Sequence, residues 1–356
     1  MKKRYLAALT LIAFSGISML LFKESERAFF PAYRNISKTW IFVLSNLMSF
    51  SRVAIWDIAA LALALSFIIS LILVIVKRKN VLSYFSYVTL IAAVLIFLAV
   101  DGWMLNHYAP KLKDELSLNV REYSFDELYE TTKHYFDEAA KYAVEMERDA
   151  EGHVVQSDFY ELASIAGSSY KQLEEAYPIF KGSNKPVKKL SLIGEYLMYN
   201  GIVGMFMPIS GEAGVPASVP IVPMPFTMAH EAGHRLGLAA EQEANFAAFL
   251  ACISNKDVRF IYSGYYNAFS YCFSALYRSD PDKARELYNS ESERGYELIR
   301  LDRLDTSKIY ASYESPLQEV SDQINDTYLK TFSQEEGIRS YGLVTDYLIA
   351  WYLEKR

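Results

Sequence analysis

The sequence predicts a mainly α-helical protein, with three N-terminal transmembrane helices followed by a mostly helical domain that has a small β element. Three observations predict this fold class. Hydrophobic residues make up 52% of the chain and are concentrated before position 109. From there onward, amphipathic helical patterns follow one another. The exception is 197–225, which is rich in Gly, Pro and branched residues and predicts loops with one or two short strands.

Three apolar runs predict a membrane region at 1–108. They cover about 5–22, 53–76 and 81–105. Each is long enough to cross a hydrocarbon core of about 30 Å, which needs roughly 20 helical residues. The first run could instead be a cleaved signal peptide, because basic residues precede it at 2–4. No small-x-small cleavage site follows "MLLFKESE", which favours a retained helix.

The orientation in the membrane follows from the basic residues of short loops, which tend to stay in the cytoplasm. The clusters at 2–4 and 77–79 agree with each other if the chain starts inside and crosses three times. The domain at 109–356 is then extracytoplasmic, and the protein is a multi-pass protein of the cell membrane. The first loop favours the opposite orientation, because it is also basic, through Lys23, Arg27, Arg34, Lys38 and Arg52.

Charge and cysteine content exclude two classes of protein. The formal net charge of −6 leaves no basic face for nucleic acid, so nucleic acid is not an expected partner. Two cysteines, Cys252 and Cys272, do not make a disulfide framework. We expect both to be buried free thiols.

Helix signals organise the rest of the chain. The sequence "SFDE" at 124–127 is a capping box that predicts a helix reaching about residue 148. Another helix is expected at 157–177, and "GSNKP" at 182–186 is a loop. The C-terminal part predicts helices at about 257–277, 281–299, 316–332 and 341–353.

The stretch "MPFTMAHEAGHRLGLAAEQEANFAAFL", residues 224–250, contains an H-E-x-x-H pattern. His230 and His234 are four residues apart, so on a helix both imidazoles can reach one ion. Glu231 is about one hundred degrees round the helix, near enough to reach a water on that ion. Any one of these residues could be an ordinary polar group, but burying them all without a metal would be costly. The pattern therefore predicts a zinc site.

A third ligand must follow, because catalytic zinc takes three protein ligands and one water. Gly237 is a suitable end for the first helix, and a second helix beginning near Ala240 would put Glu241 in its first turn. Asn245 shares a face with Glu241, so its oxygen could accept the free N–H of a ligating histidine. Glu243 would lie on the opposite side of the helix. The sequence therefore favours Glu241 over Glu243 as the third ligand.

Other polar residues give weaker signals. Tyr262 could donate a hydrogen bond to an oxyanion, although plain packing is an alternative because the chain has 27 tyrosines. His107, His134 and His153 have no partners at ligand spacing and are expected to be ordinary surface or interface residues. Asp57 lies near one end of the second apolar run, where we expect it to face interfacial water.

The motif also resembles a known family. "HEAGHRLGLAAEQEAN" is similar to the HExxHxxGxAxExEAN signature of an uncharacterised family of bacterial membrane proteins assigned to the zinc peptidases. The resemblance extends to "GIVGMFMPISGE" at 201–212, "PFTMAHE" at 225–231, "YSGY" at 262–265 and "GIRSYGLV" at 337–344. The element at 241–245 is similar to the third-ligand helix of gluzincin peptidases, which supports Glu241. The resemblance implies a zincin-like metallopeptidase domain at 109–356 and hydrolytic chemistry.

Together these observations predict a membrane-anchored zinc metallopeptidase. Zn²⁺ is held by His230, His234 and Glu241, Glu231 is the general base, and a peptide or protein is the substrate. One alternative is a non-catalytic membrane scaffold with a structural zinc site, against which the presence of Glu231 argues. Another is a zinc hydrolase of cell-wall amides or lipids. The sequence does not separate this second alternative from a peptidase.

Overall fold

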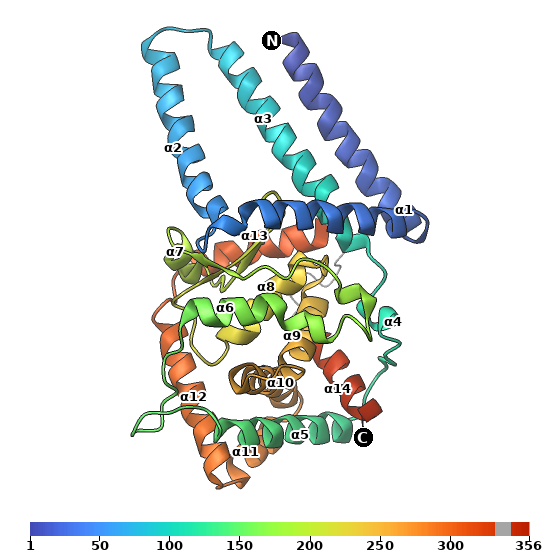
Figure 1. The fold of residues 1–356 in the computed structure, drawn as a ribbon, viewed down its shortest axis with the longest axis vertical. Helices are drawn as coiled ribbons and strands as arrows, with labels where there is room; N and C mark the ends of the chain where they lie inside the picture. The colour runs from blue at the N-terminus through green and yellow to red at the C-terminus, as the bar shows by residue number, and fades with distance from the viewer. Residues whose placement is uncertain (332–342, 356) are drawn as a thin grey trace.

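The computed structural model describes residues 1–331 and 343–355 and confirms a mainly α-helical fold (Figure 1). Three long helices, α1 (Lys2–Leu47), α2 (Ile55–Val76) and α3 (Val81–Gly102), project from one end of a larger helical body. The segments Lys2–Glu24, Ile55–Val76 and Val81–Tyr108 are long and apolar enough to cross a membrane. The prediction of three such helices is confirmed, and they suggest a membrane protein.

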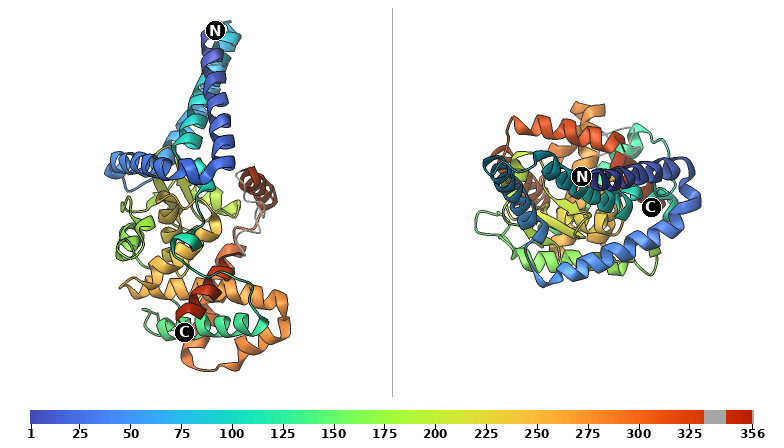
Figure 2. Two further views of the ribbon diagram at one scale, coloured as in Figure 1. Left: turned by 90° about the vertical axis from the view of Figure 1, so that its right-hand side faces the viewer. Right: turned by 90° about the horizontal axis from the view of Figure 1, so that it is seen from above.

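Helix α1 is longer than the sequence predicts. The apolar run ends near residue 22, but the helix continues to Leu47 with Pro31 inside it. The second half turns away from the first and lies across the end of the body (Figures 1 and 2). We call residues 28–47 the crosswise half of α1. Its inner face belongs to the protein interior, since Ile41 and Leu44 are part of the main hydrophobic core.

The apolar helices and the body are tied together by buried contacts. Trp103, which directly follows α3, belongs to the same main core as the helices of the body. Asp57, in the first turn of α2, is fully buried, and its carboxylate accepts hydrogen bonds from the backbone N–H groups of Ser191, Leu192 and Ile193 at 2.7, 2.8 and 3.0 Å. The expectation that Asp57 faces interfacial water is therefore wrong. Its charge is satisfied by backbone donors of the body.

The structure has a small three-stranded sheet. Its strands β1 (Lys188–Leu190), β2 (Met205–Met207) and β3 (Glu212–Pro216) have the order β1-β3-β2. Strand β3 is parallel to β1 and antiparallel to β2, so β2 is an edge strand. Strands β2 and β3 fall in the irregular region that the sequence identified. Strand β1 was not predicted, because three residues are too few to show an alternating pattern.

The remaining helices build the body. They are α4 (Leu112–Glu115), α5 (Phe125–Ala143), α6 (Phe159–Ser168), α7 (Gly194–Tyr199), α8 (Met224–Arg235), α9 (Glu241–Ile253), α10 (Val258–Ser279), α11 (Pro281–Ser290), α12 (Arg294–Ala311), α13 (Leu317–Thr331) and α14 (Val344–Lys355). Helix α10 runs through the middle, where Figure 1 shows it end-on, and packs against α5, α8 and α9.

Several sequence predictions for the body can be compared with these helices. The capping box that starts α5 is present, with reciprocal bonds between Ser124 and Glu127. Cys252 and Cys272 are free and buried, as expected. The single helix expected at 281–299 is two helices, α11 and α12, since the helical hydrogen bonding stops after Ser290 and resumes at Arg294. The expected starting point of the last helix, residue 341, lies outside the described residues, as does the 337–342 part of the "GIRSYGLV" segment.

Candidate metal centre

Helices α8 and α9 are joined by a sharp turn. Helix α8 ends at Arg235, and Gly237 has a φ of +93°, a left-handed conformation that glycine adopts without steric cost. The backbone N–H groups of Gly237 and Leu238 bond back to His234 and Gly233, which closes the turn. Helix α9 then begins at Glu241 and runs back along α8. The turn brings the first residue of α9 to the histidine face of α8.

The three predicted ligands come together at this point. His230 Nε2 is 3.3 Å from Glu241 Oε2, His234 Nε2 is 3.7 Å from Glu241 Oε1, and the two Nε2 atoms are 3.0 Å apart. Ligand atoms of a tetrahedral site with bonds of about 2.1 Å are separated by roughly 3.4 Å. These side chains form a group that could hold a metal ion, and the donor set suits zinc.

The imidazole of His234 is held in the tautomer that a metal ligand needs. Its Nδ1 lies 2.6 Å from the carbonyl oxygen of Leu238, so Nδ1–H donates there and Nε2 is left free to bind a metal. The backbone of the same residue is also fixed, because Trp103 Nε1 donates to the His234 carbonyl oxygen at 3.0 Å. The turn after α8 thus orients one ligand, and the residue that follows α3 holds its backbone.

Opposite charges stabilise each other within the group. Burial alone would lower the pKa of His234, but attraction and a hydrogen bond to Glu241 outweigh it and raise that pKa to about 9. Burial alone would raise the pKa of Glu241, but the two histidines hold it well below its usual range. Without a metal, the group therefore favours a protonated His234 beside an ionised Glu241.

Glu231 lies next to this group and is buried, with 4% of its surface exposed. Burial raises its pKa to about 7, and the charges of His230 and His234 only partly oppose this. Its Oε2 has no hydrogen-bond partner among the described residues. The backbone before β2 packs closely against the same carboxylate, since a Cβ at Gly204 would lie 2.4 Å from Glu231 Oε1. The carboxyl group is therefore held in place and can gain or lose a proton near neutral pH.

The structure separates the two candidates for the third ligand. Glu243 points away from the group, and its Oε1 accepts hydrogen bonds from the Leu112 N–H at 2.8 Å and the Tyr347 hydroxyl at 3.3 Å. The predicted hydrogen bond between Asn245 and a ligating histidine is not formed. Asn245 is buried, but its Nδ2 and the Nδ1 of His230 both have no hydrogen-bond partner among the described residues. The Nδ1–H of His234 donates instead to the backbone carbonyl of Leu238, which no sequence motif indicates.

Tyr262 lies outside the group. It is fully buried, and its hydroxyl donates to Asp302 Oδ2. The same carboxylate receives two bonds from Arg148, at 2.8 and 2.9 Å. The hydroxyl is therefore occupied by a buried ion pair, which favours the packing alternative for Tyr262 over a donor to an oxyanion.

Two other side chains that the sequence did not assign lie near the ligands. The ring of Tyr271 is 6.2 Å from Phe226 of α8, and both burial and the charge of Glu241 raise the pKa of this tyrosine. His107 is half-buried in a short 3₁₀ helix, Met104–Tyr108, and is close enough to His234 and Glu241 to interact with both electrostatically. His107 was expected to be an ordinary surface or interface residue, and its position near two of the predicted ligands was not foreseen.

The other two histidines agree better with the sequence. His134 stacks on Tyr352 with ring centroids 4.7 Å apart, and His153 pairs with Asp305. Neither belongs to the metal-binding group. They are surface and packing residues, as expected.

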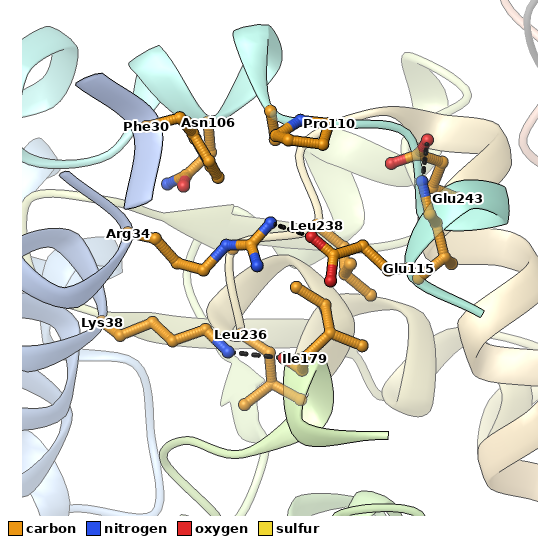
Figure 3. Close-up of a pocket in the computed structure, with 13 residues that line it drawn as sticks. Phe30, Arg34, Lys38, Asn106, Pro110, Glu115, Ile179, Leu236, Leu238 and Glu243 are labelled. Carbon is orange, nitrogen blue, oxygen red and sulfur yellow. Dashed lines mark hydrogen bonds and ion pairs between the residues drawn. The ribbon is translucent and has the colours of Figure 1, made fainter. Parts of the chain in front are cut away.

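A narrow cavity lies behind the turn and is distinct from the ligand group. It has a volume of about 10 Å³, room for one water molecule at most. Figure 3 shows Leu236 and Leu238 of the turn on one side and Arg34 and Lys38 of the crosswise half of α1 on the other, with Arg34 paired to Glu115. None of the three ligands lines this cavity. It separates the turn from the crosswise half of α1 and is too small to be a substrate site.

The chain belongs to the family described as "Protein of unknown function (DUF3810)", whose pattern it matches over residues 31–349. The match includes the ligand group and most of the body. No curated protein and no solved structure matches the chain. The family description gives no activity, so the chemistry has to be argued from the site.

Proposed function

We propose that this family member is a membrane-anchored, zinc-dependent hydrolase of peptide bonds, with Glu231 as its general base. The observation that carries the proposal is the combination of a three-donor group with an adjacent buried carboxyl group whose pKa is raised to about 7. A site that only binds metal has no need for the second feature. A hydrolytic site needs both.

The residues have distinct roles in this proposal. His230, His234 and Glu241 would hold the zinc, which supplies a Lewis acid and lowers the pKa of a bound water to near neutrality. Glu231 would accept a proton from the attacking water and return it to the leaving amine. Its raised pKa suits both transfers, because neither protonation state is strongly favoured at neutral pH. Tyr271 and His107 would be candidate donors to the developing negative charge, because both interact electrostatically with Glu241.

The edge strand β2 supports a peptide as the substrate. It follows Gly204, whose backbone packs against Glu231, and among the described residues only one of its edges is paired, with β3. An extended peptide could add to the other edge through main-chain hydrogen bonds, which would place its backbone beside the base. Such binding depends little on side chains, so a broad sequence preference is expected. The same chemistry on cell-wall amides or lipids would not need this strand.

The alternative of a structural zinc site is less well supported. Structural zinc is usually held by four protein ligands. Among the described residues, the group at this site has three, and the nearby Glu231 has an unpaired oxygen. The site therefore leaves a position for water or substrate, as a catalytic site does.

The orientation is also part of the proposal. The basic clusters at 2–4 and 77–79 favour an extracytoplasmic body. A reporter that is active only in the cytoplasm, fused after Arg356, should stay silent. A strongly active fusion would place the body on the cytoplasmic side.

The main experiment compares wild-type protein with Glu231→Gln. The variant keeps the size of the side chain but cannot accept the proton, so we expect one zinc per chain and a loss of activity of about 10²- to 10⁴-fold. Substrates are found by comparing new protein N-termini in cells that carry each form. Glu243→Gln is a matched control, because it changes another buried glutamate, whose hydrogen bonds go to Leu112 and Tyr347 and not to the proposed zinc ligands. It should keep both zinc and activity.

Two results would overturn the assignment of Glu231. One is cleavage of an identified substrate by Glu231→Gln at the wild-type rate. The other is loss of zinc from this variant while the fold is intact, since Glu231 would then be a ligand or an anchor.

A further inference from the structure

Helix α13 is amphipathic and has an exposed apolar stripe. Leu317, Val320 and Ile324 follow one another at helical spacing and are 46, 55 and 66% exposed. The opposite side carries Glu319, Asp322 and Asp326. Three large apolar side chains in one exposed row are unusual on a soluble surface and mark a site of contact with lipid or protein.

The position of α13 indicates what covers the stripe. Figure 1 shows α13 across the membrane-facing end of the body, just beneath the crosswise half of α1. Figure 2 shows it at nearly the same level as that half, and on the other side of the three projecting helices when the molecule is seen from above. Both helices lie crosswise at the level where the apolar helices leave the body, so a bilayer around these helices would meet both.

The crosswise half of α1 has the same kind of outer surface. Phe29, Ile36, Val43 and Leu47 lie on one face of the helix and are 47, 65, 52 and 62% exposed. A different face, with Ile41 and Leu44, is buried in the protein, as described above. Two crosswise helices with exposed apolar stripes therefore flank the apolar bundle, one on each side.

We propose that α13 is an interfacial membrane helix, with Leu317, Val320 and Ile324 inserted at the boundary between lipid headgroups and acyl chains. Such helices place their apolar face about 5–10 Å into that boundary. The polar face of α13 is acidic, so insertion would depend on the apolar stripe and would not require anionic lipid. A second protein is the alternative occupant, but a bilayer that surrounds the three apolar helices would already reach this level.

Docking of α13 would place the base close to the membrane surface. Ser315 Oγ, just before α13, donates to the Tyr199 carbonyl oxygen at 2.6 Å, and the side chain of Gln318 packs against Gly201. The same loop continues to Gly204, which packs against Glu231. If the proposed function holds, this arrangement favours substrates at the bilayer surface, such as the segment of a membrane protein next to its span. The docking itself does not depend on any activity.

The test measures the environment of single labelled positions. Ile324→Cys and, as a matched control on the opposite face, Asp322→Cys are labelled with the fluorophore NBD in full-length protein in phosphatidylcholine nanodiscs. The native Cys252 and Cys272 are buried, and labelling of the wild type measures their background. Nitroxide-labelled phosphatidylcholine reports contact with lipid, and iodide reports contact with water. Ile69→Cys, in the middle of α2, calibrates lipid contact.

We expect lipid nitroxide to quench the label at 324 at least about twofold more than the label at 322, and iodide to show the reverse order. Equal quenching of the two positions by iodide would overturn the proposal, because α13 would then be in water. Protection of 324 from iodide without quenching by lipid would also overturn it, since a protein would then cover the stripe. Whether Glu231→Gln loses peptide cleavage bears only on the proposed function. The quenching results bear only on the docking of α13, so the two proposals can fail separately.

Discussion

The role of Tyr262 can be decided by removing its hydroxyl. In the structure this hydroxyl donates to Asp302, whose carboxylate is also bound by Arg148. All three side chains are nearly or fully buried, with Arg148 and Asp302 9 and 1% exposed. We expect Tyr262→Phe to weaken the fold and to leave zinc content and catalysis unchanged.

The expected loss of stability in Tyr262→Phe follows from the hydrogen bonds that Asp302 keeps. A hydrogen bond to a charged group contributes about 1.5–3 kcal/mol. Asp302 keeps both bonds from Arg148 in the variant, so the lower end, about 1.5 kcal/mol, is the better estimate. At roughly 2–4 °C per kcal/mol for a domain of about 250 residues, the unfolding midpoint should fall by about 3–6 °C. Asp302→Asn leaves Arg148 buried without its anion and should cost more, about 3–5 kcal/mol.

The assay is thermal unfolding of purified protein in detergent, with zinc content and cleavage of an identified substrate measured on the same samples. A midpoint shift with unchanged cleavage agrees with the structure. An unchanged midpoint with a loss of cleavage of about 10²-fold or more would refute this reasoning, because a hydroxyl that acts only on an oxyanion gives that result.

Three further predictions concern the site and its surroundings. Zinc binding at pH 7 should release about one proton from His234, because its pKa is raised to about 9 and a metal ligand must be deprotonated. Calorimetry in buffers of different ionisation enthalpy counts the released proton. Zinc binding without proton release would contradict this prediction. Burial raises the pKa of Glu243 to about 7, above its unfolded value. As the pH rises from 5 to 8, the free energy of unfolding of the wild type should therefore fall by up to about 3 kcal/mol relative to that of Glu243→Gln. Unfolding midpoints of the two proteins at both pH values test this, and parallel pH profiles would count against it. Gly204→Ala should displace the Glu231 carboxylate and lower activity by about 10²-fold with zinc retained. Unchanged activity would show that the loop at Gly204 moves to accommodate the added methyl group.

Features that depend on a few neighbouring residues could be predicted from the sequence. The spacing of His230 and His234 fixes their common face, and Gly237 marks the turn that returns the chain. These two facts already place Glu241 beside the histidines, and the fold confirms that two helices meet there. The three apolar helices were equally clear, because a membrane span depends on length and composition alone.

Features that depend on distant residues could not be predicted. His107 is more than a hundred positions from His234, and nothing near it in the sequence suggests a shared site. The acceptor for His234 is the carbonyl of Leu238, and every residue has a carbonyl. The sequence therefore suggested Asn245, whose side chain has the right chemistry but does not make the bond. The crosswise half of α1 was missed because the charged residues at 23–27 end the apolar run without ending the helix.

The burial of Glu231 shows why the motif alone does not determine the chemistry. On an isolated helix α8 this carboxyl group would face water beside two histidines, whose charges lower its pKa. In the folded protein the pKa is raised to about 7 because burial is the larger effect. Part of that burial comes from the loop at Gly204, which packs on the carboxylate and continues to the contact with α13. The histidines and Glu241 can therefore be assigned from local spacing, whereas the proton affinity of Glu231 depends on burial, to which the distant loop at Gly204 contributes.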